Sequence, residues 1–420
     1  MKAFCLALAS FVLIFTVRCP ADFALQPNDM LAITGDSITA QHYYSAIVED
    51  YLLMCQPTPG LSVAQFGWAG ETAPGFLARV NSDLYPFKPT FVTTAYGMND
   101  GAYTALTDDI ANTYRKAQTD LVDSFKKNGV RMVVIGSPKC VDTYTYKLRN
   151  GADAATYNKN LAALAEIDKE VAAKEGVLYA DIYDDTTTVM QKAKTRYGDA
   201  YQFAGPDGVH PEQDCSLVIA YSFLKALGCD GAIGTLTVDY AAKQATAAPG
   251  QEIVSYQDGT LTVKSSRYPF CFPGHPDLPD YSAAAILKDV PFNEDLNRYM
   301  LIVKGLTTAK VKITWGATSK EFASADLAKG INLAAEFLNN PFCDQFNQVW
   351  HAVELQQSQD QILVESFLNK LARFKLMAPT ATDALDQAAK AGIAQREIMN
   401  QQAAALVIPI QHTIKIEPIP

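Results

Sequence analysis

Residues 31–41 read LAITGDSITAQ and place Gly35, Asp36 and Ser37 between a short apolar run and a segment of helical character. Ser37 has two interpretations at such a strand end. Its hydroxyl can cap the helix by accepting a hydrogen bond from a backbone N–H of the first turn, or it can be a nucleophile. A nucleophilic serine needs a base, a group that orients the base, and donors for an oxyanion. The second interpretation therefore requires partners elsewhere in the chain.

Outward from this stretch, the first half of the chain alternates between two kinds of segment. Five apolar runs have the length of strands, namely residues 30–34, 61–67, 90–97, 131–138 and 177–184. Segments with apolar residues at intervals of three and four separate them, most clearly 108–129 and 153–176, each of which stops at a glycine. This alternation predicts an α/β fold in which a parallel sheet carries helices on both faces.

The pattern changes after residue 230, which we take as the end of a domain that begins at residue 22. Residues 231–323 are predicted to be β-rich, and Asp258-Gly259 between two alternating runs indicates a hairpin. Within this segment, the proline-rich stretch 267–291 is long enough for an overhanging lid, but a surface connection is the simpler interpretation. Residues 324–420 are predicted to be helical and to end in a strand.

Composition restricts the possible partners of the chain. It has 420 residues, 49% of them hydrophobic, which is typical of a globular protein of two or three domains. The formal net charge is −10 and no Lys/Arg-rich tract is present. We do not expect the protein to bind nucleic acid, because the basic surface that such binding needs is missing.

The first 21 residues have the pattern of a secretory signal peptide. One early lysine precedes an apolar run, and small residues follow it. The run is shorter than the roughly 20 residues that a membrane-spanning helix needs, and no later segment is long and apolar enough. We therefore expect a secreted or periplasmic protein with no membrane span in the mature chain.

Cysteine and histidine patterns give no support for a metal or cofactor site. No C-x-x-C, H-E-x-x-H or glycine-rich phosphate-binding motif is present, and the chain has only five histidines. Neither a metal ion nor an organic cofactor is predicted. Six cysteines follow the predicted signal peptide, at positions 55, 140, 215, 229, 271 and 343. Export permits disulfides, but the spacing does not define their pairing.

Candidate partners of Ser37 follow later strands of the predicted sheet. Gly70, in FGWAGETA, follows the second strand, and Asn99, in AYGMNDG, follows the third. Asp207 and His210, in PDGVHP, follow the fifth strand and a helix. Ligands of open parallel sheets bind outside the carboxyl ends of the strands, so these residues are expected to lie around one site.

The residue types suit acyl transfer. His210 can accept the serine proton while Asp207, three residues earlier, holds the other ring nitrogen. The backbone N–H groups of Ser37 and Gly70 and the side-chain amide of Asn99 are candidate oxyanion donors.

In this order and rough spacing, GDSI, the glycine of GWAGET, GMND and DGVHP resemble the motifs of the SGNH, or GDSL, hydrolases, over about residues 28–230. The resemblance implies a flavodoxin-like three-layer α/β/α sandwich. It also implies Ser37 as nucleophile, His210 as base, Asp207 as its orienting acid, and Gly70 and Asn99 as oxyanion donors. An α/β-hydrolase is disfavoured because no G-x-S-x-G elbow is present.

The resemblance also suggests a function. An exported acidic SGNH enzyme with an accessory β segment is similar to polysaccharide deacetylases. The expected activity is therefore a secreted serine esterase for short acyl esters, with acetyl groups on carbohydrates as the leading substrate. An O-acyltransferase would use the same residues with a sugar hydroxyl in place of water. A glycan-binding or scaffold protein with an idle site is the alternative from a different class.

Overall fold

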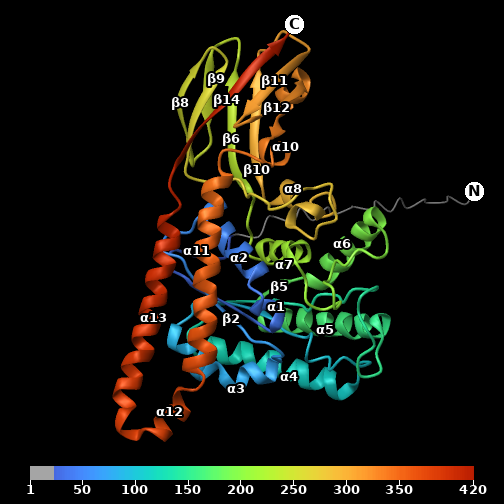
Figure 1. Ribbon diagram of the computed structural model, residues 1–420, viewed down its shortest axis with the longest axis vertical. Coiled ribbons are helices and arrows are strands. Elements are labelled where there is room, and N and C mark those ends of the chain that lie inside the picture. Colours follow the sequence, from blue (N-terminus) through green and yellow to red (C-terminus); the bar gives the residue numbers. More distant parts are fainter. Residues whose placement is uncertain (1–22) are drawn as a thin grey trace, which may run out of the picture.

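The computed structural model describes residues 23–420 (Figure 1). The predicted signal peptide, residues 1–21, lies outside the described residues. Within the described range, no helix combines the length and the apolar character that crossing a membrane requires.

Sheet A, the five-stranded parallel sheet of the first domain, has the strand order β2-β1-β3-β4-β5. Its strands are β1 (Met30–Gly35), β2 (Ser62–Gly67), β3 (Phe91–Ala95), β4 (Met132–Gly136) and β5 (Leu178–Ala180). This is the flavodoxin-like order, in which the chain leaves β1 for β2 on one side and returns to β3 on the other. The predicted α/β/α sandwich is confirmed.

Helices cover both faces of sheet A (Figure 1). One face carries α3 (Ala73–Asp83), α4 (Asp108–Lys127) and α5 (Ala154–Glu175), and the other carries α2 (Tyr43–Asp50), α6 (Ile182–Tyr197) and α7 (Gln213–Ala226). Successive strand residues point to opposite faces. In β1, Leu31 and Ile33 accordingly enter one core while Ala32 enters the other.

The ends of these helices follow from local sequence. Thr107 caps α4 by accepting a hydrogen bond from Ile110 N. Lysines occupy the last turn of α4, where their positive charges interact favourably with the negative end of the helix dipole. Asp153 caps α5, which ends at Gly176 with a φ of 65°. Both helices lie within the predicted ranges.

The predicted fifth strand, 177–184, is too long. Strand β5 ends at Ala180, and the Asp181 side chain accepts a hydrogen bond from Asp184 N. This cap starts α6 at Ile182, so the apolar residues that extend the run belong to a helix.

The second part of the chain forms two sheets. Sheet C has the order β13-β10-β6-β7, and sheet D is antiparallel with the order β12-β11-β14-β9-β8. Their strands are β6 (Ala232–Asp239), β7 (Gln244–Ala247), β8 (Gln251–Gln257), β9 (Thr260–Ser265), β10 (Arg298–Lys304), β11 (Lys310–Trp315), β12 (Thr318–Ala323), β13 (Ile331–Asn332) and β14 (Ile410–Ile419). The predicted hairpin joins β8 to β9, with both turn residues at positive φ.

The strand predicted at the end of the chain is β14, which lies in the middle of sheet D between β9 and β11. Its His412 is buried and bonds to Ser265 of β9 and to Trp315 of β11. Residues from the predicted β-rich and helical segments therefore share one sheet.

The stretch 267–291 was predicted to be a surface connection, but much of it is buried. Tyr268, Phe270 and Phe272 are at most 8% exposed. The ring of Phe270 packs against those of Phe292, in α8 (Phe292–Asp295), and Phe346. Because aromatic side chains gain by leaving water, this loop is part of the core between the two parts of the chain.

Residues 343–405 form a helical arm that runs along sheet A (Figure 1). Two short helices precede it, α9 (Ser324–Lys329) and α10 (Leu333–Glu336). The arm consists of α11 (Cys343–Gln361), the π-helical turn Ile362–Leu368, α12 (Leu371–Met377) and α13 (Thr382–Ala405). Helix α11 contacts α2 and β2, and α13 returns beside it.

Side chains of the helical arm form hydrogen bonds with backbone groups on the outer edge of β2. Val63 N donates to Asn400 Oδ1 over 3.1 Å, and Gln65 N donates to Asp360 Oδ2 over 3.2 Å. Gln356 Nε2 donates to the Val63 carbonyl over 3.0 Å. An uncovered edge strand offers free backbone groups for pairing with another chain, and here polar side chains of the arm occupy them.

Candidate active site

Ser37 is the first residue of α1 (Ser37–Ala40), and only Asp36 separates it from β1. The cap of this short helix is Asp36, whose Oδ1 accepts a hydrogen bond from Ile38 N over 2.9 Å. The Ser37 hydroxyl is therefore not needed as the cap, and its Oγ lies 2.8 Å from His210 Nε2.

His210 and Asp207 continue this chain of contacts. His210 Nδ1 lies 2.8 Å from Asp207 Oδ2. The other carboxylate oxygen of Asp207 accepts hydrogen bonds from the backbone N–H groups of Val209 and His210, each over 2.9 Å. The Asp207 carboxylate thus fixes the turn and the ring of His210 together, and the structure brings the three predicted residues into one hydrogen-bonded row.

Gly205 lets the loop before His210 fold tightly. Its φ is 95°, and a Cβ atom there would lie 1.7 Å from the His210 carbonyl oxygen. A neighbouring segment anchors the loop through Thr145 Oγ1, which donates to the Gly205 carbonyl, and Asp142 N, which donates to that of Gly208. These contacts hold His210 in place from both sides.

The surroundings of Asp207 favour its ionised form. Burial by itself raises the pKa of this carboxyl, but the hydrogen bonds from the backbone and ring of His210 and from Val209 outweigh it and hold the pKa at about 2. The Arg149 guanidinium lies 3.5 Å from Asp207 Oδ2. Asp207 is therefore a carboxylate at every pH near neutrality.

Asn99 and Gly70 lie in neighbouring loops, after β3 and β2. Asn99 Nδ2 donates to the carbonyl of Glu71 over 2.9 Å, which ties the two loops together and leaves the second amide hydrogen of Asn99 for another acceptor. Gly70 has a φ of 74°, and a Cβ atom there would meet nothing within 4 Å. The backbone of residue 70 thus borders open space, and its left-handed conformation favours glycine.

Asp100 fixes the same two loops. Its carboxylate oxygens accept hydrogen bonds from Ala73 N and Gly97 N, each over 2.9 Å. Burial raises the pKa of Asp100 to about 6. Asp100 is the last residue of the GMND motif, but the pattern of that motif assigns it no role.

Two further residues of the site were missed. Tyr103 donates its hydroxyl hydrogen to Asn99 Oδ1 over 3.0 Å. It follows Ala102, and both have positive φ, an arrangement that costs energy and clusters at functional sites. Arg149, the second residue, lies over the Tyr103 ring with its guanidinium carbon 5.2 Å from the ring centre. No motif marks either residue.

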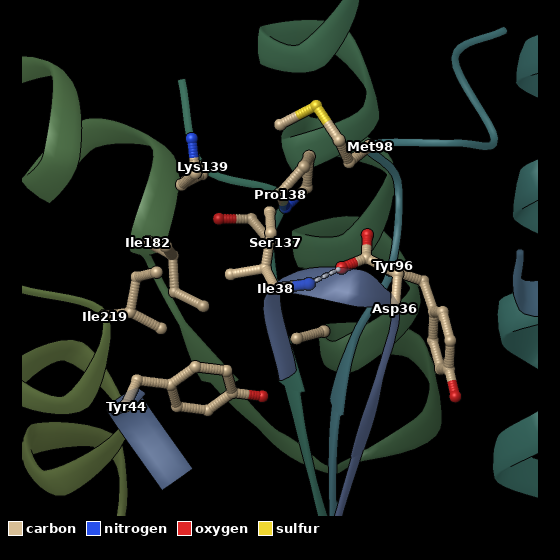
Figure 2. Close-up of a pocket in the computed structure, with 11 residues that line it drawn as sticks. Asp36, Ile38, Tyr44, Tyr96, Met98, Ser137, Pro138, Lys139, Ile182 and Ile219 are labelled. Atoms are coloured by element: carbon tan, nitrogen blue, oxygen red, sulfur yellow. Dashed lines mark hydrogen bonds between the residues drawn. The ribbon is translucent and has the colours of Figure 1, made fainter. Parts of the chain in front are cut away.

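A small cavity of about 20 Å³ lies beside the start of α1 (Figure 2). Its lining is mostly apolar and includes Ile38, which follows Ser37, and Met98, which precedes Asn99. Asp36 borders it, and burial raises the pKa of that carboxyl to about 7.

Among residues 23–420, no three or more His, Cys, Asp and Glu side chains are grouped in a way that could hold a metal ion.

Comparisons with known proteins identify a family and a fold. A family model described as the GDSL-like lipase/acylhydrolase family matches residues 33–214. No curated protein sequence matches the chain. A gut microbial diltiazem-metabolizing enzyme of known structure is similar over 94% of this chain and 98% of its own, with 21% identity and a TM-score of 0.73. At that identity the likeness shows the fold, and it extends over both parts of the chain.

Smaller structures match about half of the chain. An acetylxylan esterase from Geobacillus stearothermophilus covers 49% of this chain and 96% of its own, with 21% identity and a TM-score of 0.40. A putative GDSL-like lipase from Parabacteroides merdae covers 49% and 98%, with 15% identity and a TM-score of 0.42.

Proposed function

Because residues 33–214 form a domain of the GDSL-like lipase/acylhydrolase family and the chain is an ester hydrolase of that family, we propose that Ser37 is its nucleophile. The proposal rests on one observation, the row of contacts from Ser37 Oγ through the His210 ring to Asp207, with 2.8 Å at each step. Nucleophile, base and orienting acid are each within hydrogen-bond reach of the next, as acyl transfer requires.

In the proposed reaction, Ser37 Oγ attacks the ester carbonyl while His210 Nε2 accepts its proton. The imidazolium that forms is stabilised by Asp207, which remains a carboxylate. His210 then gives the proton to the departing alcohol, and an acyl-enzyme remains on Ser37. Water, deprotonated by His210, attacks this acyl group. The bond between the acyl carbon and Ser37 Oγ breaks, His210 returns the proton to Oγ, and the acid is released.

The oxyanion of the tetrahedral intermediate would be held by three donors, the backbone N–H groups of Ser37 and Gly70 and the Asn99 amide. The bonds of Asn99 to Glu71 and Tyr103 support this role, because they fix the plane of the amide before substrate arrives. Donors that are already oriented need no reorganisation when charge develops.

We propose short acyl groups, acetyl above all, as the substrates, with a carbohydrate as the alcohol part. The short acyl group is suggested by the resemblance of the sequence to polysaccharide deacetylases. The carbohydrate part rests on similarity to polysaccharide deacetylases alone.

A fluorophosphonate probe followed by peptide mapping tests the assignment of Ser37. Labelling of Ser37 that is lost in His210→Ala supports an active nucleophile and excludes an idle site in a binding protein. Release of acetate from acetylated xylan without an added acceptor favours hydrolysis. Transfer of the acetyl group to an added sugar, with no free acetate, indicates an O-acyltransferase. The substrate panel includes a chain-length series of simple esters and diltiazem, because a structural neighbour is described as diltiazem-metabolizing.

We also propose export with removal of residues 1–21. Sequencing the N-terminus of the protein recovered outside the cytoplasm checks this. A mature chain that keeps the apolar run would contradict it.

A further inference from the structure

Cys271 and Cys343 lie together at the junction between the two parts of the chain. Cys271 belongs to the buried loop after β9, and Cys343 is the first residue of α11, where the helical arm begins. Their Sγ atoms are 3.0 Å apart. A disulfide requires roughly 2.05 Å, so a movement of about 1 Å closes the bond.

We propose that Cys271 and Cys343 form a disulfide that links the loop after β9 to the start of the helical arm. This inference does not depend on the proposed esterase activity. Export, which the sequence predicts, would bring the pair into an environment where disulfides form and persist.

The surroundings of the two sulfurs give them different tasks in oxidation. Cys343 is partly exposed, and its Sγ accepts a hydrogen bond from Asn340 N over 3.4 Å. The hydrogen bond with Cys271 lowers the pKa of the Cys343 thiol, whereas burial raises that of Cys271. Cys343 is therefore the thiolate that an external oxidant reaches first.

The oxidant is a small disulfide, such as oxidised glutathione. The Cys343 thiolate attacks one of its sulfurs, which forms a mixed disulfide and releases one glutathione thiolate. Cys271 loses its proton to that thiolate and attacks Cys343 Sγ, which displaces the second glutathione. The protein loses two electrons and two protons, and one oxidised glutathione becomes two reduced molecules.

Peptide mapping of the full-length protein under non-reducing conditions tests the link. The protein is incubated with oxidised glutathione, free thiols are alkylated, and the chain is cut with trypsin. Cleavage after Arg267, Lys288, Lys329 and Lys370 places Cys271 and Cys343 in separate peptides, 268–288 and 330–370, each with a single cysteine. We expect one cross-linked species that lacks two hydrogens relative to the sum of the peptides. Recovery of both peptides in alkylated form, or of either one joined to another cysteine, would overturn the proposal.

Thermal unfolding gives a second readout. A reductant should lower the melting temperature of the oxidised protein by several degrees, since a disulfide restricts the unfolded chain. Cys343→Ser should melt at the temperature of the reduced protein and should not respond to reductant. The matched control is Cys140→Ser, which removes a buried cysteine in the loop after β4 and should keep the response. An equal response to reductant in Cys343→Ser and the wild type would also refute the link.

Discussion

Asp36 and Ser37 are neighbours that divide two tasks at the start of α1. Capping the helix falls to Asp36 through its bond to Ile38 N, and Ser37 Oγ is left to face His210. Either residue type can cap a helix. Asp36 thus takes the capping role that a serine could otherwise fill.

Ser37 and His210 are expected to act as one unit. Ser37→Ala and His210→Ala should each lower kcat on the order of 10⁴-fold or more, and the double variant should be little worse than either, because each residue works only through the other. Steady-state kinetics on an acetyl ester measures this, with circular dichroism as the control for folding. Losses that multiply in the double variant would contradict a shared mechanism.

Tyr103 is expected to act through Asn99. Asn99→Ala should lower kcat by roughly 10²- to 10³-fold with little change in KM, the effect of losing one oxyanion donor. Tyr103→Phe removes only the hydroxyl that bonds Asn99 Oδ1 and should cost roughly 2- to 12-fold in kcat, the worth of one hydrogen bond. The phenylalanine ring keeps the stacking on Tyr157.

The double variant Asn99→Ala/Tyr103→Phe tests whether Tyr103 positions Asn99 or has a general structural role. If Tyr103 only orients the Asn99 amide, Tyr103→Phe should cost nothing further once Asn99 is alanine. An additional loss of the same size would mean that Tyr103 acts elsewhere.

Sequence could predict those site residues that sit in short local motifs. Ser37 follows β1, and Asp207 and His210 are three residues apart in one turn, and these three bond in one row. Arg149 and Tyr103 reach the site from loops whose path depends on tertiary contacts, such as the bond from Asn150 Nδ2 to the Ala102 carbonyl. No pattern in the sequence encodes such a path.

At the scale of the elements, the contact between the helical arm and β2 includes a buried ion pair. Arg396 is 4% exposed, and its Nε donates to Asp360 Oδ1 over 2.9 Å, while the other oxygen of Asp360 accepts from Gln65 N. Arg396 also donates to Ser62 Oγ on the same strand. Breaking a buried ion pair by removing one partner leaves an uncompensated charge.

Arg396→Met should therefore destabilise the protein by about 3 to 5 kcal/mol at pH 8. Burial raises the pKa of Asp360 to about 6, above the roughly 3.9 of an unfolded aspartate. The folded state thus binds this proton more tightly, and ionisation of Asp360 costs stability as the pH rises through this range. Arg396 offsets part of that cost, so the variant should lose much less at pH 5 than at pH 8.

Urea unfolding at pH 5 and pH 8 measures the difference. Adding Asp360→Asn to Arg396→Met removes the orphaned charge and should recover part of the loss at pH 8. A loss of equal size at both pH values, unchanged by the second substitution, would show that Arg396 acts by packing alone.

Element boundaries show where sequence patterns fail. The run 177–184 continues its apolar character into α6, and only the cap at Asp181 separates strand from helix. The periods of a short buried strand and of a helix start are too similar to distinguish over so few residues. Long helices with clear caps, such as α4, were predicted within two residues.

At the scale of the whole molecule, the first domain depends on residues that come much later in the chain. A chain that ends at residue 230 would leave the outer edge of β2 without Gln356, Asp360 and Asn400. We expect this fragment to aggregate, because an open edge strand pairs with other chains.

Size-exclusion chromatography of fragment 22–230 beside the full-length protein checks this expectation. The informative control keeps the helical arm and changes only the edge contacts, as in Asn400→Ala, which should remain monomeric and lose stability. A monodisperse, active fragment would show that the arm is dispensable.

Sequence predicted the architecture of sheet A because its strands and helices alternate along the chain, and the connection rules for parallel strands then restrict the topology. It predicted a strand at the end of the chain but not the partners of that strand. Pairing of β14 with β9 and β11 joins distant segments, and alternation of apolar residues identifies a strand without saying where it pairs.

The central place of β14 in sheet D has a consequence for the order of folding. Thr262 pairs with Thr413 and Trp315 with Ile414, so closing this sheet brings together segments that the whole helical arm separates. Forming contacts between residues so far apart in sequence first loses the entropy of the intervening loop, and only then do the contacts stabilise the fold. Once sheet A and the arm have formed, the ends of the segment between β11 and β14 are already close together. The remaining entropic cost of pairing β14 is then small. We therefore expect the amides of sheet D to gain hydrogen-exchange protection last, after the first domain has folded.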